Sequence, residues 1–147
     1  MASPIAHSLA GISIYWLSRR KTRPENLRDI SRRDLLAAGG VIFLANVSDF
    51  DLIIGWFADR YLHHQVSHTF AFALFLGGLA AMAAPLLKIK PWRAFWLTAA
   101  VVGSHVIIDY FTKDTTTPKG CMLFWPVTDR YYIFPVPVFL DIWRMSL

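Results

Sequence analysis

The residues of this 147-residue chain that are best suited to chemistry are its histidines and a few aspartates that lie in apolar sequence. They are His7, Asp49, Asp51, His63, His64, His68, His105 and Asp109. Imidazole and carboxylate together suit zinc, manganese or iron better than calcium. A carboxylate in an apolar helix costs about 3 kcal/mol on insertion scales, and such residues normally mark function. We therefore predict a site for one or two divalent ions, with zinc as the first choice.

Two spacings can be examined against helix geometry. His105 and Asp109 are four residues apart, so both side chains lie on one helix face and can coordinate one ion. Asp49 and Asp51 are two residues apart, which places them on nearly opposite faces of a regular helix. Either one of them points away or the helix opens there, with Gly55 close by. We favour Asp51 as a direct or bridging ligand, and Asp49 as a ligand of a second ion or as the partner that orients a histidine.

Three histidines precede an apolar segment that begins at Thr69. We predict His68 as a ligand. Helical geometry would pair His64 with His68, whereas a pair of His63 and His68 needs a turn between them. For His63 and His64 a solvated loop histidine is the alternative. Ser67 or Thr69 is expected to cap the next helix.

Two further residues are weaker ligand candidates. His7 lies in a short apolar segment that gives no other reason for a histidine, and an interfacial, hydrated histidine is the alternative. Cys121 is the single cysteine, so no intrachain disulfide can form, and it is a weak ligand candidate.

The elements that must position these residues are apolar. Hydrophobic residues make up 55% of the chain and charged residues only 17%, with a mean hydropathy of +0.40, whereas a soluble domain carries about 25% charge. Five apolar segments run over residues 4–17, 36–57, 69–87, 92–111 and 131–143. About 20 residues are needed to cross a bilayer. The middle three meet that length, while the first and the last, which Pro135 and Pro137 interrupt, are marginal. We predict a single all-α domain over residues 1–147, a small polytopic bundle of about four transmembrane helices with a Pro-broken or re-entrant C-terminal segment.

The basic residues predict the orientation in the membrane. Ten of the fifteen Lys and Arg fall within residues 19–33 and 88–93, between apolar segments, where topology-setting charges belong. We place both loops in the cytoplasm of an inner-membrane protein, with the N-terminus and all five histidines toward the outside. The charge pattern argues against a nucleic-acid partner, while the 19–33 loop could contact anionic lipid or a cytoplasmic protein.

Taken together and in this order, these residues resemble the YdjM-like family of inner-membrane proteins, which are described as metal-dependent hydrolases. The family pattern has a His in the first apolar segment, an Asp-x-Asp, a His-Arg-x-x-Thr/Ser-His-Ser stretch, a His-x-x-x-Asp pair and a Gly followed six residues later by Pro. This chain carries each piece from His7 to Pro126. It departs at His64 and Gln65, where the family usually has Arg-Gly, which leaves open whether Arg60 or Arg130 replaces a phosphate-binding arginine. The match favours His63 over His64 as the ligand.

The resemblance implies metal-activated water acting on an ester or phosphoester, with Asp51 or Asp49 as general base. The order of ligands also looks like that of the helical zinc phospholipase C and nuclease class. No Gly-x-Ser-x-Gly elbow is present. A site at headgroup depth suggests a phospholipid or lipid-linked phosphate, which the basic residues of the outer loops could attract; they are Arg60, Lys113, Lys119 and Arg130.

Two other functions remain as alternatives. One is a membrane scaffold with a structural metal site, whose basic 19–33 loop binds a partner. The other is a small ion transporter, which would need polar residues through the bilayer, whereas the inner halves of the segments are apolar apart from Ser13 and Ser18.

Overall fold

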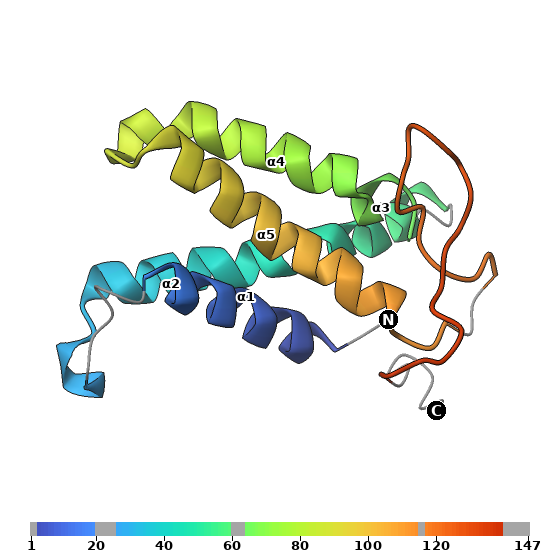
Figure 1. The fold of residues 1–147 in the computed structure, drawn as a ribbon, viewed down its shortest axis with the longest axis horizontal. Helices are drawn as coiled ribbons and strands as arrows, with labels where there is room; N and C mark the ends of the chain where they lie inside the picture. Colours follow the sequence, from blue (N-terminus) through green and yellow to red (C-terminus); the bar gives the residue numbers. More distant parts are fainter. Residues whose placement is uncertain (1–2, 20–25, 60–63, 115–116, 140–147) are drawn as a thin grey trace.

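The computed structural model describes residues 3–19, 26–59, 64–114 and 117–139, and within them the chain is helical, without a strand. Figure 1 shows α4 alongside α5 and α1 alongside α2, with α1 also packed against α5. The α-helices are α1 (Pro4–Ser18), α2 (Arg32–Ala45), α3 (Phe50–Ala58), α4 (Phe70–Ala83) and α5 (Pro91–Tyr110). Short 3-10 turns cover Leu27–Asp29 (η1), Val47–Asp49 (η2), Val66–His68 (η3) and Ala84–Leu87 (η4). The predicted all-α class is confirmed.

Local sequence determines where the helices begin. The Ser31 side chain accepts from the backbone N–H of Asp34, whose carboxylate accepts from the N–H of Ser31, a reciprocal capping box that starts α2. Thr69 accepts from the N–H of Phe72 at 2.9 Å and caps α4, so the second of the two predicted caps is observed. Close helix packing then depends on Gly11 of α1, where an added Cβ would lie 2.9 Å from the Cβ of Ala45.

Fewer of the described helices can span a membrane than the sequence predicts. Within the described residues, the helical run Phe70–Leu87 is long and apolar enough to cross a bilayer. The pair Arg32–Ala45 and Val47–Ala58 passes the same test only if the two helices are joined across a 49° bend. α1 is too short, at 15 residues, and α5 is long enough but too polar. The prediction of about four transmembrane helices is therefore not confirmed.

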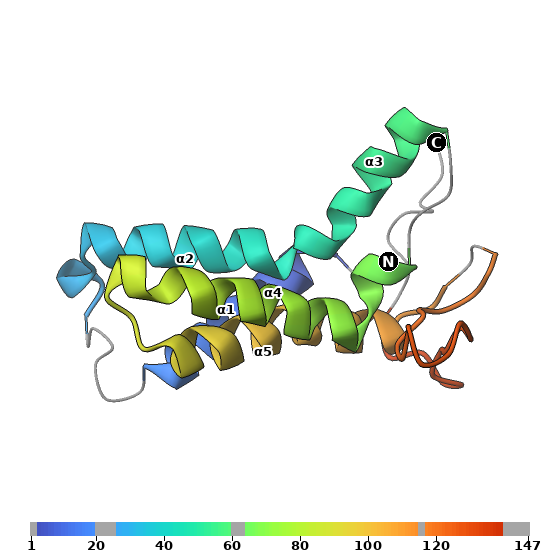
Figure 2. The same ribbon diagram turned by 90° about the horizontal axis from the view of Figure 1, so that it is seen from above.

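The bend between α2 and α3 is the main irregularity of the bundle. α2 ends at Ala45, η2 follows over Val47–Asp49, and α3 then projects away from the other helices, as Figure 2 shows. The helix thus opens beside Asp49, one of the two outcomes that the Asp49–Asp51 spacing allowed. Gly55 lies farther on, inside α3.

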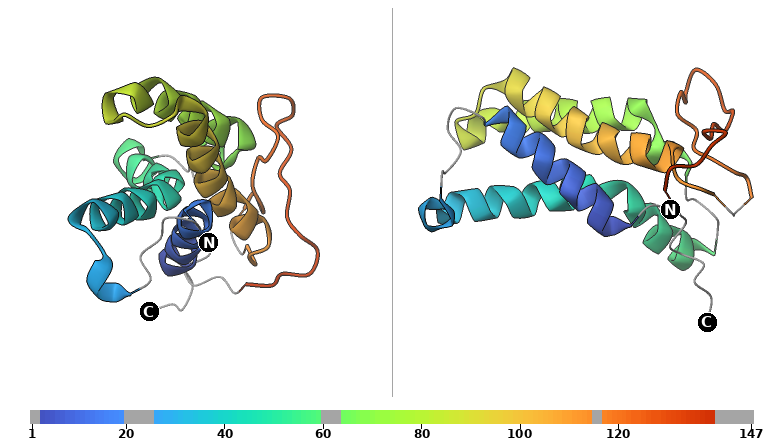
Figure 3. Two further views of the ribbon diagram at one scale, coloured as in Figure 1. Left: turned by 60° about the vertical axis from the view of Figure 1, so that its left-hand side comes forward. Right: turned by 60° about the horizontal axis from the view of Figure 1, so that its bottom comes forward.

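The C-terminal apolar segment is not a helix as far as Phe139. Residues 117–139 loop beside the end of α5 (Figure 3), with isolated bridges that pair Cys121 with Tyr132 and Thr112 with Phe139. Gly120 makes this loop feasible: its φ is +91°, and an added Cβ would lie 2.3 Å from the carbonyl oxygen of Tyr132.

The bundle has two chemically different ends. The start of α1, the α2–α3 bend, the start of α4 and the end of α5 lie at one end, and the connection between α4 and α5 lies at the other (Figures 1 and 3). The described ligand candidates therefore gather at one end, as the sequence predicts. Of the basic 19–33 loop, residues 20–25 lie outside the described part. Which end faces the outside of the cell remains a prediction.

Candidate metal centre

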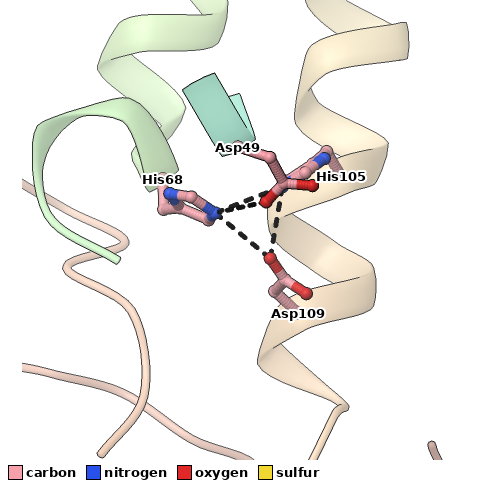
Figure 4. Close-up of side chains that lie close together, drawn as sticks. All are labelled: Asp49, His68, His105 and Asp109. Carbon is pink, nitrogen blue, oxygen red and sulfur yellow. Dashed lines mark hydrogen bonds and ion pairs between the residues drawn. The ribbon is translucent and has the colours of Figure 1, made fainter. Parts of the chain in front are cut away.

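Four side chains converge at this end of the bundle. They are Asp49, His68, His105 and Asp109, and each offers one ligand atom within 4.8 Å of the other three. Figure 4 shows that they come from three separate elements and point toward one another. His68, His105 and Asp109 are buried, while Asp49 is partly buried. Two imidazoles and two carboxylates form a donor set typical of zinc, manganese or iron.

The distances between the ligand atoms fit one cation. The Nε2 atoms of His68 and His105 are 3.2 Å apart, and each lies 3.2 Å from Oδ2 of Asp109. Oδ1 of Asp49 lies 3.5 Å from Nε2 of His105 and 3.8 Å from that of His68. Ligands held about 2.0–2.2 Å from a shared ion are roughly 3–3.6 Å apart. The four groups need to move by only a few tenths of an ångström to hold an ion between them.

The local structure explains how each of the four side chains is positioned in the cluster. His105 and Asp109 lie in the last two turns of α5, on the same face because they are four residues apart. His68 ends η3, directly before the Thr69 cap of α4. Asp49 ends η2, where the 3-10 turn interrupts what would otherwise be one long helix. The break in the helix is thus what brings the fourth group to the other three.

Neighbouring groups fix the orientation of both imidazoles. Nδ1 of His105 lies 2.7 Å from the carbonyl oxygen of Ala45, an acceptor, so Nδ1 carries the proton. Nδ1 of His68 lies 3.1 Å from Oδ2 of Asp51, which also accepts from the hydroxyl of Ser67. In both rings the Nε2 lone pair is therefore available inside the cluster. A histidine whose outer N–H donates to a carboxylate or a carbonyl is the usual arrangement around a bound metal.

The electrostatics of His68 favour a cation. Burial alone would lower the pKa of His68, but the nearby carboxylates of Asp109, Asp49 and Asp51 raise it well above its usual value. The cluster therefore attracts positive charge, and a divalent cation bound between these carboxylates would replace the proton.

Comparison with known proteins places the chain in a family. The family model described as YdjM inner membrane protein matches residues 1–146. This chain belongs to the YdjM family. No curated protein and no solved structure matches it. The resemblance predicted from the motifs is thereby confirmed over nearly the whole length, and the description of the family agrees with the predicted location in the inner membrane.

In this YdjM-family chain the two aspartates of the Asp-x-Asp motif lie differently from the preference drawn from the sequence. Asp49 joins the four-residue cluster, whereas Asp51, on the first turn of α3, contacts the outer nitrogen of His68. The reason is the 3-10 turn at Val47–Asp49, which turns the Asp49 carboxylate toward α5. Asp51 thus occupies the place of the partner that orients a ligating histidine.

The other histidines adjoin the cluster without entering it. His7 is fully buried, and its ring stacks on that of His105 with centroids 3.7 Å apart. His63 lies outside the described residues. His64 is buried, with Nδ1 3.2 Å from Oδ2 of Asp114 and its ring edge-on to His68.

Asp114 is a residue near the site that sequence reasoning missed. Asp114 contacts His64 and also accepts from the N–H of Gly120 at 2.8 Å, so it ties the loop after α5 to the site. Asp114 lies in a loop fifty residues from His64, and no local pattern connects them. Cys121 packs in an apolar cluster with Val106 and Leu123, and burial raises the pKa of its thiol well above the usual value.

The basic residues expected to attract phosphate are only partly described. Lys113, Lys119 and Arg130 are exposed on the loop that follows α5, and Arg60 lies outside the described residues.

Proposed function

We propose that this YdjM-family protein is a membrane-bound metal-dependent hydrolase that uses activated water to cleave an ester or phosphoester. One observation carries the proposal: His68 and His105 present Nε2, with its lone pair available, to the same point that the carboxylates of Asp49 and Asp109 approach. Zinc is the ion that this donor set suits best, with manganese and iron as further choices. When bound there, a divalent ion lowers the pKa of a coordinated water to near neutrality and polarises the oxygen of the scissile group.

The protein groups have distinct roles in this reaction. His68, His105 and Asp109 hold the ion, and Asp51 and the carbonyl of Ala45 keep the two imidazoles in place. Asp49 is the more accessible carboxylate of the cluster, and neither of its oxygens has a hydrogen-bond partner among the described residues. It can therefore contribute one oxygen to the ion and accept the proton of the attacking water with the other.

The atoms of the hydrolysis balance without a further reactant. The water oxygen bonds to phosphorus or to the carbonyl carbon, its proton passes to Asp49, and the bond to the leaving oxygen breaks. Asp49 then passes that proton to the leaving oxygen. We propose a phospholipid or lipid-linked phosphate as substrate, because the protein is in the membrane and Lys113, Lys119 and Arg130 are exposed on the loop beside the site.

The test is hydrolysis by the purified protein in detergent or nanodiscs, supplied with zinc or manganese. A panel of phospholipids, lipid phosphates and soluble phosphoesters is incubated, and products are detected by mass spectrometry. We expect phosphoester cleavage that is lost in His105→Gln and Asp49→Asn and retained in Asp59→Asn, a surface change at the end of α3. A protein that holds its metal and cleaves no member of the panel would contradict the proposal.

A further inference from the structure

His7 has no evident use in the four-residue centre, yet it is one of the most buried side chains of the chain. Neither ring nitrogen has a hydrogen-bond partner among the described residues. A buried polar atom without a partner is unfavourable, and native structures rarely leave one without a reason such as a bound ion or water. The two buried ring nitrogens of His7 therefore indicate that this side chain binds an ion or a water.

The position of Asp109 indicates where that ligand lies. Its Oδ2 lies 3.2 Å from Nε2 of both His68 and His105, whereas its Oδ1 lies 3.6 Å from Nε2 of His7. One oxygen of the Asp109 carboxylate thus faces two imidazoles, and the other oxygen faces a third, that of His7. The separation of 3.6 Å is close to that of two ligands about 2.1 Å from a shared ion.

Asp49 provides further negative charge near His7. It is close enough for its charge to act on His7, and both of its oxygens lack hydrogen-bond partners among the described residues. Stacking on His105 keeps the His7 ring roughly parallel to a ligating ring, with 18° between the planes. The ring is therefore held in place before any ion binds.

We propose that Asp109 bridges two divalent cations, the first in the four-residue centre and the second held by its Oδ1 and Nε2 of His7. Carboxylate-bridged pairs of ions lie about 3.5–4 Å apart. With two protein ligands identified, the second ion keeps positions for water and for an oxygen of the substrate.

This inference rests on the proposed function for its chemical meaning and makes that function more specific. Two neighbouring cations can stabilise both the attacking and the leaving oxygen of an in-line displacement. That arrangement suits a phosphoester better than a carboxylic ester. The substrate class is therefore a phosphomonoester or phosphodiester.

The test is the number of ions bound per chain in the purified full-length protein, loaded with zinc or manganese and freed of excess ion. Elemental analysis should give two equivalents for the wild type and one for His7→Phe, which keeps a ring to stack on His105 but has no nitrogen. Ser8→Ala is the matched control on the same helix, because it removes only a hydroxyl that accepts from Asn46 and donates to the carbonyl of Pro4, and it should keep two.

A single equivalent in the wild type, or two in His7→Phe, would overturn the second site. Electron paramagnetic resonance of the manganese-loaded wild type tests the second site without a variant. Two ions about 4 Å apart give an exchange-coupled spectrum, whereas the six-line spectrum of an isolated ion would contradict the bridge. The outcomes also separate the two proposals: two ions without hydrolysis refute only the proposed function, and hydrolysis with one ion refutes only the second site.

Discussion

Replacing Asp51 by asparagine should weaken metal binding although Asp51 is not one of the four clustered residues. Its Oδ2 lies 3.1 Å from Nδ1 of His68 and also accepts from the hydroxyl of Ser67. Asparagine has almost the same size but no charge, so it polarises the imidazole less and can present its NH2 group instead of its oxygen. His68 would then be both a poorer ligand and a less well oriented one.

The size of the effect follows from the burial of this contact. A hydrogen bond to a charged group contributes about 1.5–3 kcal/mol, and His68 and Asp51 are both buried. At about 1.4 kcal/mol for each factor of ten, that range corresponds to a loss of roughly 10–100-fold in affinity. Removal of groups that orient metal-bound histidines in other proteins costs a similar factor.

The assay is competition for zinc between the purified protein and a chromophoric chelator at fixed pH. Asp59→Asn is the matched control, since Asp59 is exposed at the end of the same helix in a left-handed conformation that asparagine adopts readily. We expect wild-type affinity for Asp59→Asn and the 10–100-fold loss for Asp51→Asn. Equal affinity of all three proteins would refute the assigned role of Asp51.

Three further experiments test the loop after α5. Gly120→Ala should lower the midpoint of thermal unfolding markedly, since the alanine Cβ would collide with the chain at a φ of +91°, whereas Gly78→Ala, with nothing within 4 Å, should not. Asp114→Asn should lower the free energy of unfolding by about 1–2 kcal/mol. It should also speed hydrogen exchange at the backbone amide of Gly120, which donates to Asp114. The thiol of Cys121 should resist maleimide at pH 7–8 until the protein is denatured, because burial raises its pKa and keeps it protonated below that value; ready labelling of the folded protein would contradict its burial.

Much of the site could be predicted because its signals are local. The four-residue spacing of His105 and Asp109 determines that they share a face in any helix, and the structure shows them 3.2 Å apart. His68 could be located because it precedes a capping Thr69 and a long apolar run. The limits of α1 and α5 lie within one residue of the predicted apolar segments, whereas segment 36–57 is divided between α2 and α3.

What could not be predicted depends on contacts between distant parts of the chain. The spacing of Asp49 and Asp51 allowed the helix to open there, but nothing local indicated a 49° bend between Ala45 and Val47 that brings Asp49 rather than Asp51 into the cluster. The His64–Asp114 contact joins two loops, and its geometry depends on how segment 117–139 folds back. The apolar segment 131–143 was expected to be Pro-broken or re-entrant, and as far as Phe139 it is irregular, with Pro135 and Pro137 in it and Tyr132 paired with Cys121.

The central claim is that Asp49, His68, His105 and Asp109 hold a divalent cation. Elemental analysis of the purified protein, beside His68→Ala and Asp109→Ala variants shown to be folded by circular dichroism, tests it most directly. We predict at least one equivalent of zinc, manganese or iron in the wild type and a loss of that metal in both variants. Unchanged metal content in both variants, or a wild type that binds none of these ions when they are supplied, would contradict it.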